Sequence, residues 1–495
     1  MIQIENQVIK QQKNFWNNCL FHPTDAIEDP WGKRILDRIA EDKAADTIRI
    51  YTMFEDIVYI DGNGDLAYDF RLTDLRLDYL IEKGYNILLA YAAMPDCIAA
   101  NKDATRSNSK NKTRYKGKMF NTSAPTDYAL WEEICYTYTK HLVERYGIDV
   151  VSKWHLQCFN EPDIPQFFLS DLPREAVETR AEAYCKLYTA FAKGILRVSE
   201  NLCIGGPTLA EFTSFMELFL NYIKENQIRL DFISYHNYAG TSPYTLLEPD
   251  GSFMVENWVK QNEYILSAIR KCGFEDTEVI VDEWGMSSCG FYNIEECPAF
   301  IARETEVYSA YFVKLIYTIL EKGWNISKMM ICLSGQHEMV TDFSGFRNFF
   351  TMNFFAKPIY NAYVLSGKLH KGLLRANCDN KNVYVIPTKN EKDDYAVFLA
   401  YCSEKFHEDL PDITEKIAFP ESAIGKTATI YCIDKEHNNP YRLYERKGYT
   451  PDLTEEQIKI LKAEGNLSVY AKLPVCETLE LPLTANAVYL IETED

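Results

Sequence analysis

Two glutamates in the chain stand where a pair of carboxyl groups can do acid–base and nucleophilic chemistry. Glu161 lies in an Asn-Glu-Pro segment and Glu283 lies in an Asp-Glu-Trp segment, and a short apolar run leads into each. A neutral carboxylic acid can protonate a leaving oxygen, while an ionised carboxylate attacks the carbon that this oxygen leaves. When two such groups lie about 5–5.5 Å apart, they suit hydrolysis of a glycosidic bond with retention of configuration.

The distance between the two glutamates along the chain indicates that they share one site. Positions 161 and 283 are 122 residues apart, which corresponds to three strand–helix units of about 40 residues each in a barrel of parallel strands. If Glu161 follows the fourth strand, Glu283 therefore ends the seventh. Both side chains then lie at the C-terminal ends of barrel strands, where barrel enzymes place the groups that act on substrate.

Further polar side chains fall at the ends of predicted strands. The second strand carries Arg49, the fourth is followed by Asn160, and the sixth ends with His236 and Tyr238. Taken singly, each has an ordinary structural interpretation as a buried ion pair, a turn residue, a satisfied core histidine or a packing tyrosine. Together with the two glutamates they form a candidate site.

Apolar runs that alternate with helical patterns predict the α/β class. The expected strands are Phe15–Phe21, Thr47–Thr52, Tyr85–Ala92, Lys153–Phe159, Leu202–Gly206, Asp231–His236, Glu278–Glu283 and Lys328–Ser334. Three helical stripes, each followed by a glycine, are Leu72, Leu75 and Tyr79; Trp131, Ile134, Cys135, Tyr138 and Leu142; and Tyr308, Tyr311, Phe312, Leu315 and Ile319. Seven or eight such units favour a (β/α)8 TIM barrel. A doubly wound open sheet is the alternative, but no Gly-x-Gly-x-x-Gly motif follows any strand.

After about residue 365 the pattern changes to the alternation of a β-sandwich. The expected strands are Asn382–Thr388, Asp394–Cys402, Thr427–Asp434, Leu467–Leu473, Glu477–Leu483 and Ala487–Glu492. One helical segment, Thr454–Ala463, interrupts them. We therefore expect a catalytic barrel over residues 15–365 and an accessory C-terminal β-sandwich domain over residues 366–495.

Composition and charge exclude several classes of partner. The chain has 495 residues, with 52 Lys and Arg against 72 Asp and Glu and a net charge of −20, so neither nucleic acid nor a membrane surface is an expected partner. No signal peptide is visible and the 14 cysteines form no Cys-x-x-Cys pair, which favours a cytoplasmic protein with reduced thiols. The eight histidines show no metal-ligand spacing, and we expect neither a metal nor another cofactor.

One segment departs from this acidic balance. Asn101–Asp127, after the third strand, contains seven Lys and Arg residues and should lie at the rim of the barrel mouth. It is either a solvated loop or a surface for an anionic leaving group or a decorated oligosaccharide.

The chain resembles glycoside hydrolase family 39, the β-xylosidase and α-L-iduronidase family within clan A of the glycoside hydrolases. The resemblance covers nearly the whole sequence. It is carried by residues 15–19, 47–56, 78–84, 94–95, 141–147, 154–163, 205–207, 231–238, 282–284, 357–358 and 441–444.

This resemblance implies roles for the candidate residues. Glu161 would be the acid/base and Glu283 the nucleophile of a retaining, exo-acting hydrolase that cleaves terminal sugars. Asn160, His236 and Tyr238 would bind sugar hydroxyls, and Trp284 belongs to the same substrate-binding set. Arg49 would keep the nucleophile ionised. The resemblance also implies that residues 1–14 join the β-sandwich. Similar enzymes form tetramers, so a homo-oligomer is compatible with the resemblance, but the sequence leaves the oligomeric state open.

Departures from the family pattern leave the sugar open. Tyr51 stands where xylosidases commonly have a histidine, and the strand-eight segment lacks their tryptophan, although Glu338, beside His337, matches a family glutamate that binds the sugar. The substrate is therefore a β-xyloside or another glycoside, such as a β-glucoside, a β-galactoside, an arabinopyranoside or a uronide. A carbohydrate-binding protein without catalysis is the alternative of a different class.

Overall fold

Eight parallel strands close into a barrel in the computed structural model, which describes all residues except 22–26, 108–118, 240–253, 291, 335–338 and 406–407. The strands are β3 (Asn18–Phe21), β4 (Thr47–Tyr51), β7 (Asn86–Tyr91), β10 (His155–Cys158), β11 (Cys203–Leu209), β12 (Phe232–Tyr238), β13 (Glu278–Gly285) and β14 (Ile326–Leu333). Each pairs with the next in chain order, and β14 pairs in parallel with β3. The predicted (β/α)8 barrel is confirmed, and the open sheet is excluded because no barrel strand has a free edge.

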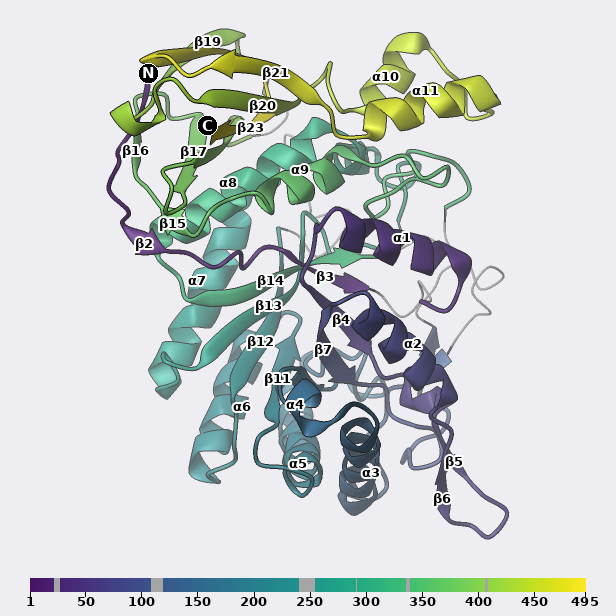
Figure 1. Cartoon of the computed structure of the whole chain (residues 1–495). Helices are drawn as coiled ribbons and strands as arrows, with labels where there is room; N and C mark the ends of the chain where they lie inside the picture. The colour runs from purple at the N-terminus through teal and green to yellow at the C-terminus, as the bar shows by residue number, and fades with distance from the viewer. Residues whose placement is uncertain (22–26, 108–118, 240–253, 291, 335–338, 406–407) are drawn as a thin grey trace.

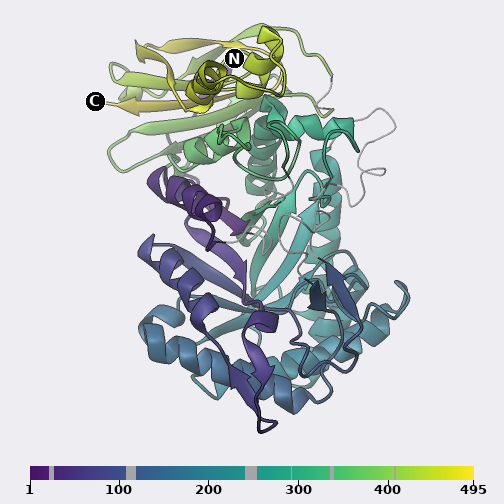
Figure 2. The same cartoon turned by 90° about the vertical axis from the view of Figure 1, so that its right-hand side faces the viewer.

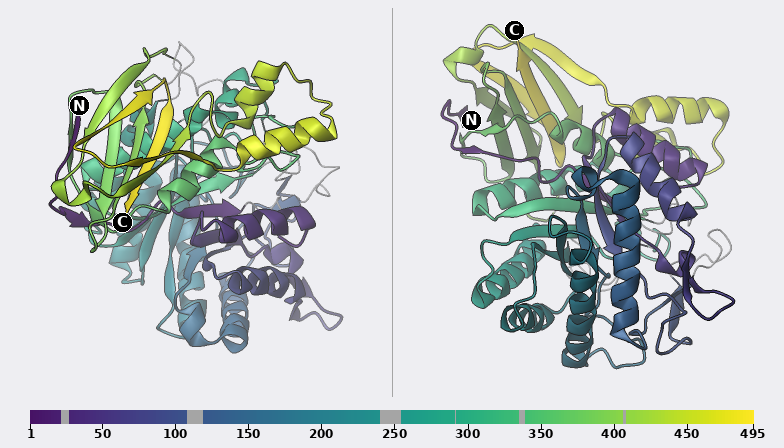
Figure 3. Two further views of the ribbon diagram at one scale, coloured as in Figure 1. Left: turned by 45° about the horizontal axis from the view of Figure 1, so that its top comes forward. Right: turned by 60° about the horizontal axis from the view of Figure 1, so that its bottom comes forward.

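Helices surround the barrel on its outside (Figure 1, Figure 3). They are α1 (Pro30–Glu41), α2 (Arg71–Glu82), α3 (Tyr128–Tyr146), α5 (Val177–Leu196), α6 (Thr213–Glu225), α7 (Val255–Cys272) and α8 (Glu306–Lys322), with a short α4 (Ile148–Val151) after α3 and α9 (Pro358–Ser366) after the last strand. The predicted apolar stripes of α3 and α8 are buried as expected.

Two sequence predictions are corrected here. Leu75 does not face the core, since the residue is 47% exposed. Helix α2 instead buries a face that includes Leu77 and Leu80 together with Arg76, which forms an ion pair with Glu28 at 2.7 Å. Because a charged residue lies on the buried face, the spacing of the apolar residues alone does not identify that face. The first barrel strand is also shorter than expected, because Phe15 and Trp16 precede β3 rather than lying in it.

Two further sheets form the accessory β-sandwich, which lies beside the barrel against the outer helices α8 and α9 (Figure 2). The seven-stranded sheet contains β2 (Lys10–Gln11), β15 (Gly372–Leu373), β17 (Val383–Lys389), β18 (Tyr395–Tyr401), β23 (Ala487–Glu494), β20 (Thr427–Ile433) and β21 (Val469–Pro474). The four-stranded sheet contains β16 (Ala376–Cys378), β1 (Ile2–Ile4), β19 (Ile413–Ala418) and β22 (Thr478–Leu483). Helix α8 contacts both the barrel and the seven-stranded sheet. The division of the chain near residue 365 stays a prediction.

Two helices of the C-terminal region belong to neither sheet and lie against the barrel domain (Figure 1). The predicted helix is α11 (Glu455–Gly465), which begins with a capping box formed by Thr454 and Gln457. Helix α10 (Pro440–Lys447) was not expected from its apolar pattern, although a cap at Asn439, a proline at the first position and Gly448 after the end are its sequence signals. A buried contact anchors α10, because Arg442 pairs with Glu306 at 2.8 Å.

Within the described ranges, no helix combines the length and the apolar character that crossing a membrane requires.

Candidate active site

The predicted residues meet at the C-terminal ends of the barrel strands. Glu161 follows β10, the fourth barrel strand, and Glu283 lies near the end of β13, the seventh. A carboxylate oxygen of each glutamate and a ring nitrogen of His236 all lie within 4.8 Å of one another. The two carboxyl groups are therefore close enough to act on the same bond of a substrate.

Three side chains hold Glu283, of which only 6% is exposed. Arg49 donates from Nη1 to Oε1 at 2.8 Å, and the hydroxyl of Tyr51 lies 3.1 Å from the same oxygen, with its single proton shared between this oxygen and Oδ1 of Asn160. The hydroxyl of Tyr238 donates to Oε2 at 2.7 Å. Both oxygens therefore accept hydrogen bonds, which suits an ionised carboxylate.

Glu161 has a different environment. Its Oε1 lies 2.8 Å from Nδ1 of His236, and its backbone N–H donates to the carbonyl of Thr208 at 3.1 Å. Its neighbour Asn160 accepts at Oδ1 from Nη2 of Arg49 and from the hydroxyl of Tyr51, both at 2.8 Å. Arg49 thus joins the residues of β4, β10 and β13 into one site.

The backbone of this site is strained. Phe159, Glu161 and Thr208 have positive φ angles of 66°, 45° and 56°, a region that residues other than glycine rarely occupy. The ladder between β11 and β12 also shifts register beside Thr208. Such conformations cost about 1–3 kcal/mol each and persist where the surrounding structure fixes them, which is common at functional sites.

The charges of the site give the two glutamates opposite protonation tendencies. Burial by itself would lower the pKa of His236, but the carboxylates of Glu283, Asp282 and Glu161 raise it to about 10. Burial would likewise raise the pKa of Glu283, yet the positive charges of His236 and Arg49 hold it well below its usual value. For Glu161 burial prevails and raises the pKa. The pKa values of the two carboxyl groups are thus shifted in opposite directions. One group therefore suits the role of base or nucleophile, and the other suits the role of acid.

A buried polar network below the glutamates was not predicted from the sequence. Gln157 accepts from Nε of Arg49 at 2.9 Å and donates to Oδ2 of Asp282 at 2.7 Å. Thr208 donates to the same oxygen of Asp282 at 2.9 Å. The available signal was a glutamine in the middle of an otherwise apolar strand, because such a residue needs buried partners.

Arg347 is a second residue that the sequence did not single out. It is 7% exposed and donates from Nη1 to the hydroxyl of Tyr238 at 2.9 Å and from Nε to Ser334 at 3.1 Å. Its charge also lowers the pKa of Glu283. Gly290 makes room for it, since a Cβ atom there would lie 2.4 Å from Nη2 of Arg347. The segment that carries Arg347 follows no periodic pattern, so nothing in the sequence pointed to it.

Trp284 is not brought into the site. Its side chain is fully buried, stacks on Phe312 at 5.6 Å and donates from Nε1 to the hydroxyl of Tyr363 at 3.1 Å. The expectation that Trp284 contacts substrate is therefore corrected, because side chains along a strand alternate and its own points away from Glu283 to the helices. Glu338 and His337 lie outside the described residues.

The model of the glycosyl hydrolases family 39 matches residues 1–475 of the chain. The chain belongs to this family. A β-xylosidase of Caldicellulosiruptor saccharolyticus is 25% identical over 466 residues, which are 90% of this chain and 87% of that protein. An α-L-iduronidase of Homo sapiens is 26% identical over 167 residues, which cover 31% of this chain and 23% of that protein.

Among solved structures, a monomeric β-xylosidase from Caulobacter crescentus CB15 has the same fold. It matches with a TM-score of 0.83 and 20% identity, covering 100% of this chain and 99% of that chain. The resemblance to family 39 is thus confirmed over both the barrel and the accessory sheets.

Within the described residues, two groups have the composition of a metal site, namely Glu161, His236 and Glu283, and Cys432, Asp434 and His437. In the first, Nδ1 of His236 lies 2.8 Å from Glu161, and the surrounding carboxylates raise the pKa of His236. In the second, burial raises the pKa of the Cys432 thiol well above its usual value. The prediction of no metal and no cofactor stays a prediction.

Proposed function

We propose that this family 39 protein is a retaining, exo-acting β-xylosidase-like enzyme. The observation that carries the proposal is the close pair of Glu161 and Glu283, with oxygen atoms within 4.8 Å and pKa values shifted in opposite directions. An inverting enzyme needs about 6.5–9.5 Å between its carboxyl groups for a water molecule, whereas a retaining enzyme needs about 5–5.5 Å.

The proposed reaction has two displacements. Glu161 gives its proton to the leaving oxygen while Glu283 attacks the anomeric carbon and forms a glycosyl-enzyme. Glu161, now ionised, takes a proton from water, which then breaks the glycosyl–enzyme bond. Both bonds of Asn160 to Arg49 and Tyr51 use Oδ1, which leaves its amide hydrogens as donors toward the sugar 2-hydroxyl. His236 positions Glu161, and Tyr238 and Arg49 position Glu283.

The choice of sugar rests on the relatives. The β-xylosidases align over 90% and 91% of the chain, while the α-L-iduronidase of Homo sapiens aligns over 31%. A β-xyloside is therefore the first substrate to test, and β-glucosides, β-galactosides, arabinopyranosides and uronides are the alternatives.

A panel of 4-nitrophenyl glycosides tests this function, with proton NMR of the first-formed sugar. We expect the β-xyloside to give the highest kcat/KM and to release β-xylose before mutarotation. An α-anomer as first product would exclude the double displacement. Saturable sugar binding without release of nitrophenol would identify a carbohydrate-binding protein instead.

A variant of Arg347 tests the electrostatics of the nucleophile. Arg347→Met removes a cation that lowers the pKa of Glu283, so this pKa should rise. Because Glu283 must be ionised, the acid limb of the kcat/KM–pH profile should move to higher pH, and kcat/KM should fall about tenfold or more. Arg347→Lys, which keeps the charge, should keep the acid limb near that of the wild type. An unchanged acid limb in Arg347→Met would show that Arg347 acts on packing alone.

We also propose the cytoplasm as the location, with a glycoside or oligosaccharide as the partner. Most of the 14 cysteines are buried. Cysteines in this number without a Cys-x-x-Cys pair suit a reducing compartment. The oligomeric state stays a prediction.

A further inference from the structure

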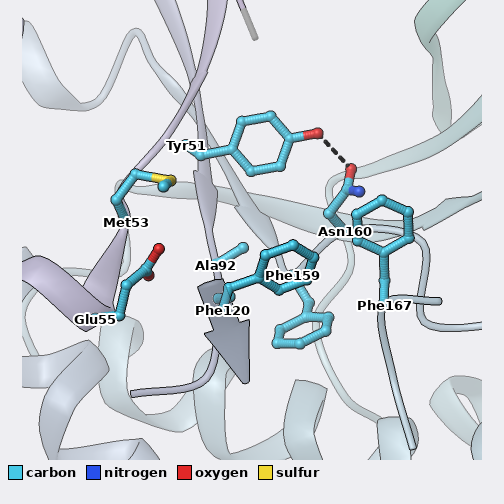
Figure 4. Close-up of a pocket in the computed structure, with 9 residues that line it drawn as sticks. Tyr51, Met53, Glu55, Ala92, Phe120, Phe159, Asn160 and Phe167 are labelled. Carbon is cyan, nitrogen blue, oxygen red and sulfur yellow. Dashed lines mark hydrogen bonds between the residues drawn. The ribbon is translucent and has the colours of Figure 1, made fainter. Parts of the chain in front are cut away.

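A polar pocket lies on the accessory β-sandwich, apart from the pocket that Tyr51 and Asn160 line beside the glutamates (Figure 4). It is bounded by the seven-stranded sheet and by the segment that joins α9 to β15, and its volume is about 330 Å³. Pockets for small molecules usually measure about 300–1,000 Å³. The volume therefore suits a small ligand, and none of the residues that line this pocket belongs to the candidate active site.

Three neighbouring strands present side chains to the pocket from one face of the sheet. Lys472 of β21 is paired with Thr429 of β20, and Thr429 is paired with Glu492 of β23. Directly paired residues of an antiparallel ladder have their side chains on the same face. Tyr431 lies two residues after Thr429, so its ring is on this face as well. All four residues line the pocket.

Lys368 reaches the same face from the segment after α9. Its ammonium group pairs with Glu492 at 2.8 Å and lies 5.1 Å from the ring centroid of Tyr431. The contact connects the segment to two strands of the sheet. The pocket therefore has walls from two parts of the chain, and an ion pair holds these walls together.

The charges around the pocket balance. Three lysines and three acidic residues surround it, namely Lys368, Lys426, Lys472, Asp394, Glu492 and Glu494. Besides the pair of Lys368 and Glu492, Lys426 pairs with Asp394 at 2.7 Å. A ligand with a net charge would gain little attraction from a balanced set of this kind. The pocket therefore favours a neutral ligand.

Several hydrogen-bonding groups of the pocket are available to such a ligand. The ring of His370 forms no hydrogen bond with any described residue, and its bond to Thr388 uses the backbone N–H instead. Burial lowers the pKa of His370, so near neutral pH its imidazole is uncharged and offers one donor and one acceptor. Lys472 and Glu494 are exposed, and neither forms an ion pair within the described part of the chain.

We propose that this pocket is a non-catalytic binding site for one neutral sugar unit. A sugar hydroxyl both donates and accepts hydrogen bonds, which matches the ammonium of Lys472, the carboxylate of Glu494 and the imidazole of His370. The partly exposed ring of Tyr431 offers an apolar surface to the C–H groups of the sugar. Because the chain belongs to a glycosyl hydrolase family, sugars are the neutral polar molecules that it meets. The site stands on its own lining residues and does not depend on the proposed activity.

Crystals of the full chain soaked with D-xylose, and separately with D-glucose, test where the sugar binds. We expect a sugar ring in the pocket beside Tyr431, with hydroxyls bonded to His370 and Lys472. A pocket that stays empty at saturating concentrations of both sugars would overturn the proposal.

Saturation-transfer NMR with D-xylose tests binding in solution. This signal reports every site on the protein, whereas kcat/KM for a 4-nitrophenyl glycoside reports the active site alone. The double variant His370→Ala/Lys472→Ala should lower the saturation transfer about twofold or more and leave kcat/KM within about twofold of the wild type. Lys472→Ala alone changes only an exposed residue of the edge strand β21, so it tests the pocket even if the double variant fails to fold, and it should lower the signal in the same direction.

The matched control removes the same two residue types outside the pocket. His437 and Lys416 lie on the accessory domain with side chains 46% and 56% exposed, and His437→Ala/Lys416→Ala should keep the wild-type saturation transfer. An equal loss in the control, or no loss in the pocket variants, would overturn the proposal. Sugar density in the crystal with no loss in the pocket variants would then mean binding at crystal concentration only.

The site and the proposed function fail separately. Pocket-dependent binding of D-xylose by a folded protein that hydrolyses no glycoside of the panel would overturn the function and leave the site in place. Hydrolysis of the panel with an empty pocket would do the reverse.

Discussion

Glu283→Ala is expected to hydrolyse every glycoside roughly 10⁴-fold more slowly or worse, whatever the leaving group. Without the carboxylate no glycosyl-enzyme can form, so an activated leaving group gives no relief. Azide is small enough to enter the space that the side chain leaves, and it attacks the anomeric carbon from that side. A β-glycoside should therefore give an α-glycosyl azide, which proton NMR identifies.

Glu278→Ala is the matched control for this result. Glu278 begins the same strand, β13, but it lies at the opposite end of the barrel, where it pairs with His155 at 3.2 Å. We expect its hydrolysis rate to stay within a few-fold of the wild type. A Glu283→Ala variant that keeps more than a tenth of the wild-type rate would remove Glu283 from the role of nucleophile.

Glu161→Ala should show the opposite dependence on the leaving group. General acid–base assistance is typically worth about 10²–10⁴-fold, and this loss should appear with poor leaving groups such as methanol. Dinitrophenolate departs without a proton, so the first step should survive, and the glycosyl-enzyme should accumulate because water lacks its base. Azide needs no base, so it should speed turnover and give a β-glycosyl azide.

The two azide products test the assignment of the carboxylates directly. An α-azide from the Glu161 variant and a β-azide from the Glu283 variant would show that the two roles are exchanged. A loss below about tenfold for Glu161→Ala on an unactivated substrate would contradict its role as the acid.

The barrel and its two glutamates could be predicted because their signals are local or regularly spaced. Apolar runs mark the strands, and a constant strand–helix length places Glu161 and Glu283 on strands four and seven. Which polar residues meet inside the barrel depends instead on the register between its strands. Asp282 and Gln157 are brought together by strands 125 positions apart along the chain, and no local pattern records that contact.

The predictions that the structure contradicts, and the site residue that the sequence did not reveal, have related physical causes. Trp284 adjoins Glu283 in sequence, but alternation along β13 turns the tryptophan to the helices, where α8 and α9 bury it. The spacing of Leu72, Leu75 and Tyr79 predicts a buried face that includes Leu75, but α2 buries Arg76 instead, whose partner Glu28 comes from another segment. Arg347 reaches the site from an irregular segment, and its position depends on the tertiary fold around Gly290.

The pairing of β1 with β16 and β19 gives the fold a temporal order during synthesis. Ile2 lies beside Cys378 on one side and Ile417 on the other, so β1 gains its first partner only when Ala376–Cys378 has been made. At about 5–20 residues per second, the ribosome needs on the order of 20–75 s to reach that point. The barrel can close earlier, because its last strand, β14, ends at Leu333. Strand β1 therefore stays unpaired while the barrel strands are completed, and the four-stranded sheet can form only after the barrel.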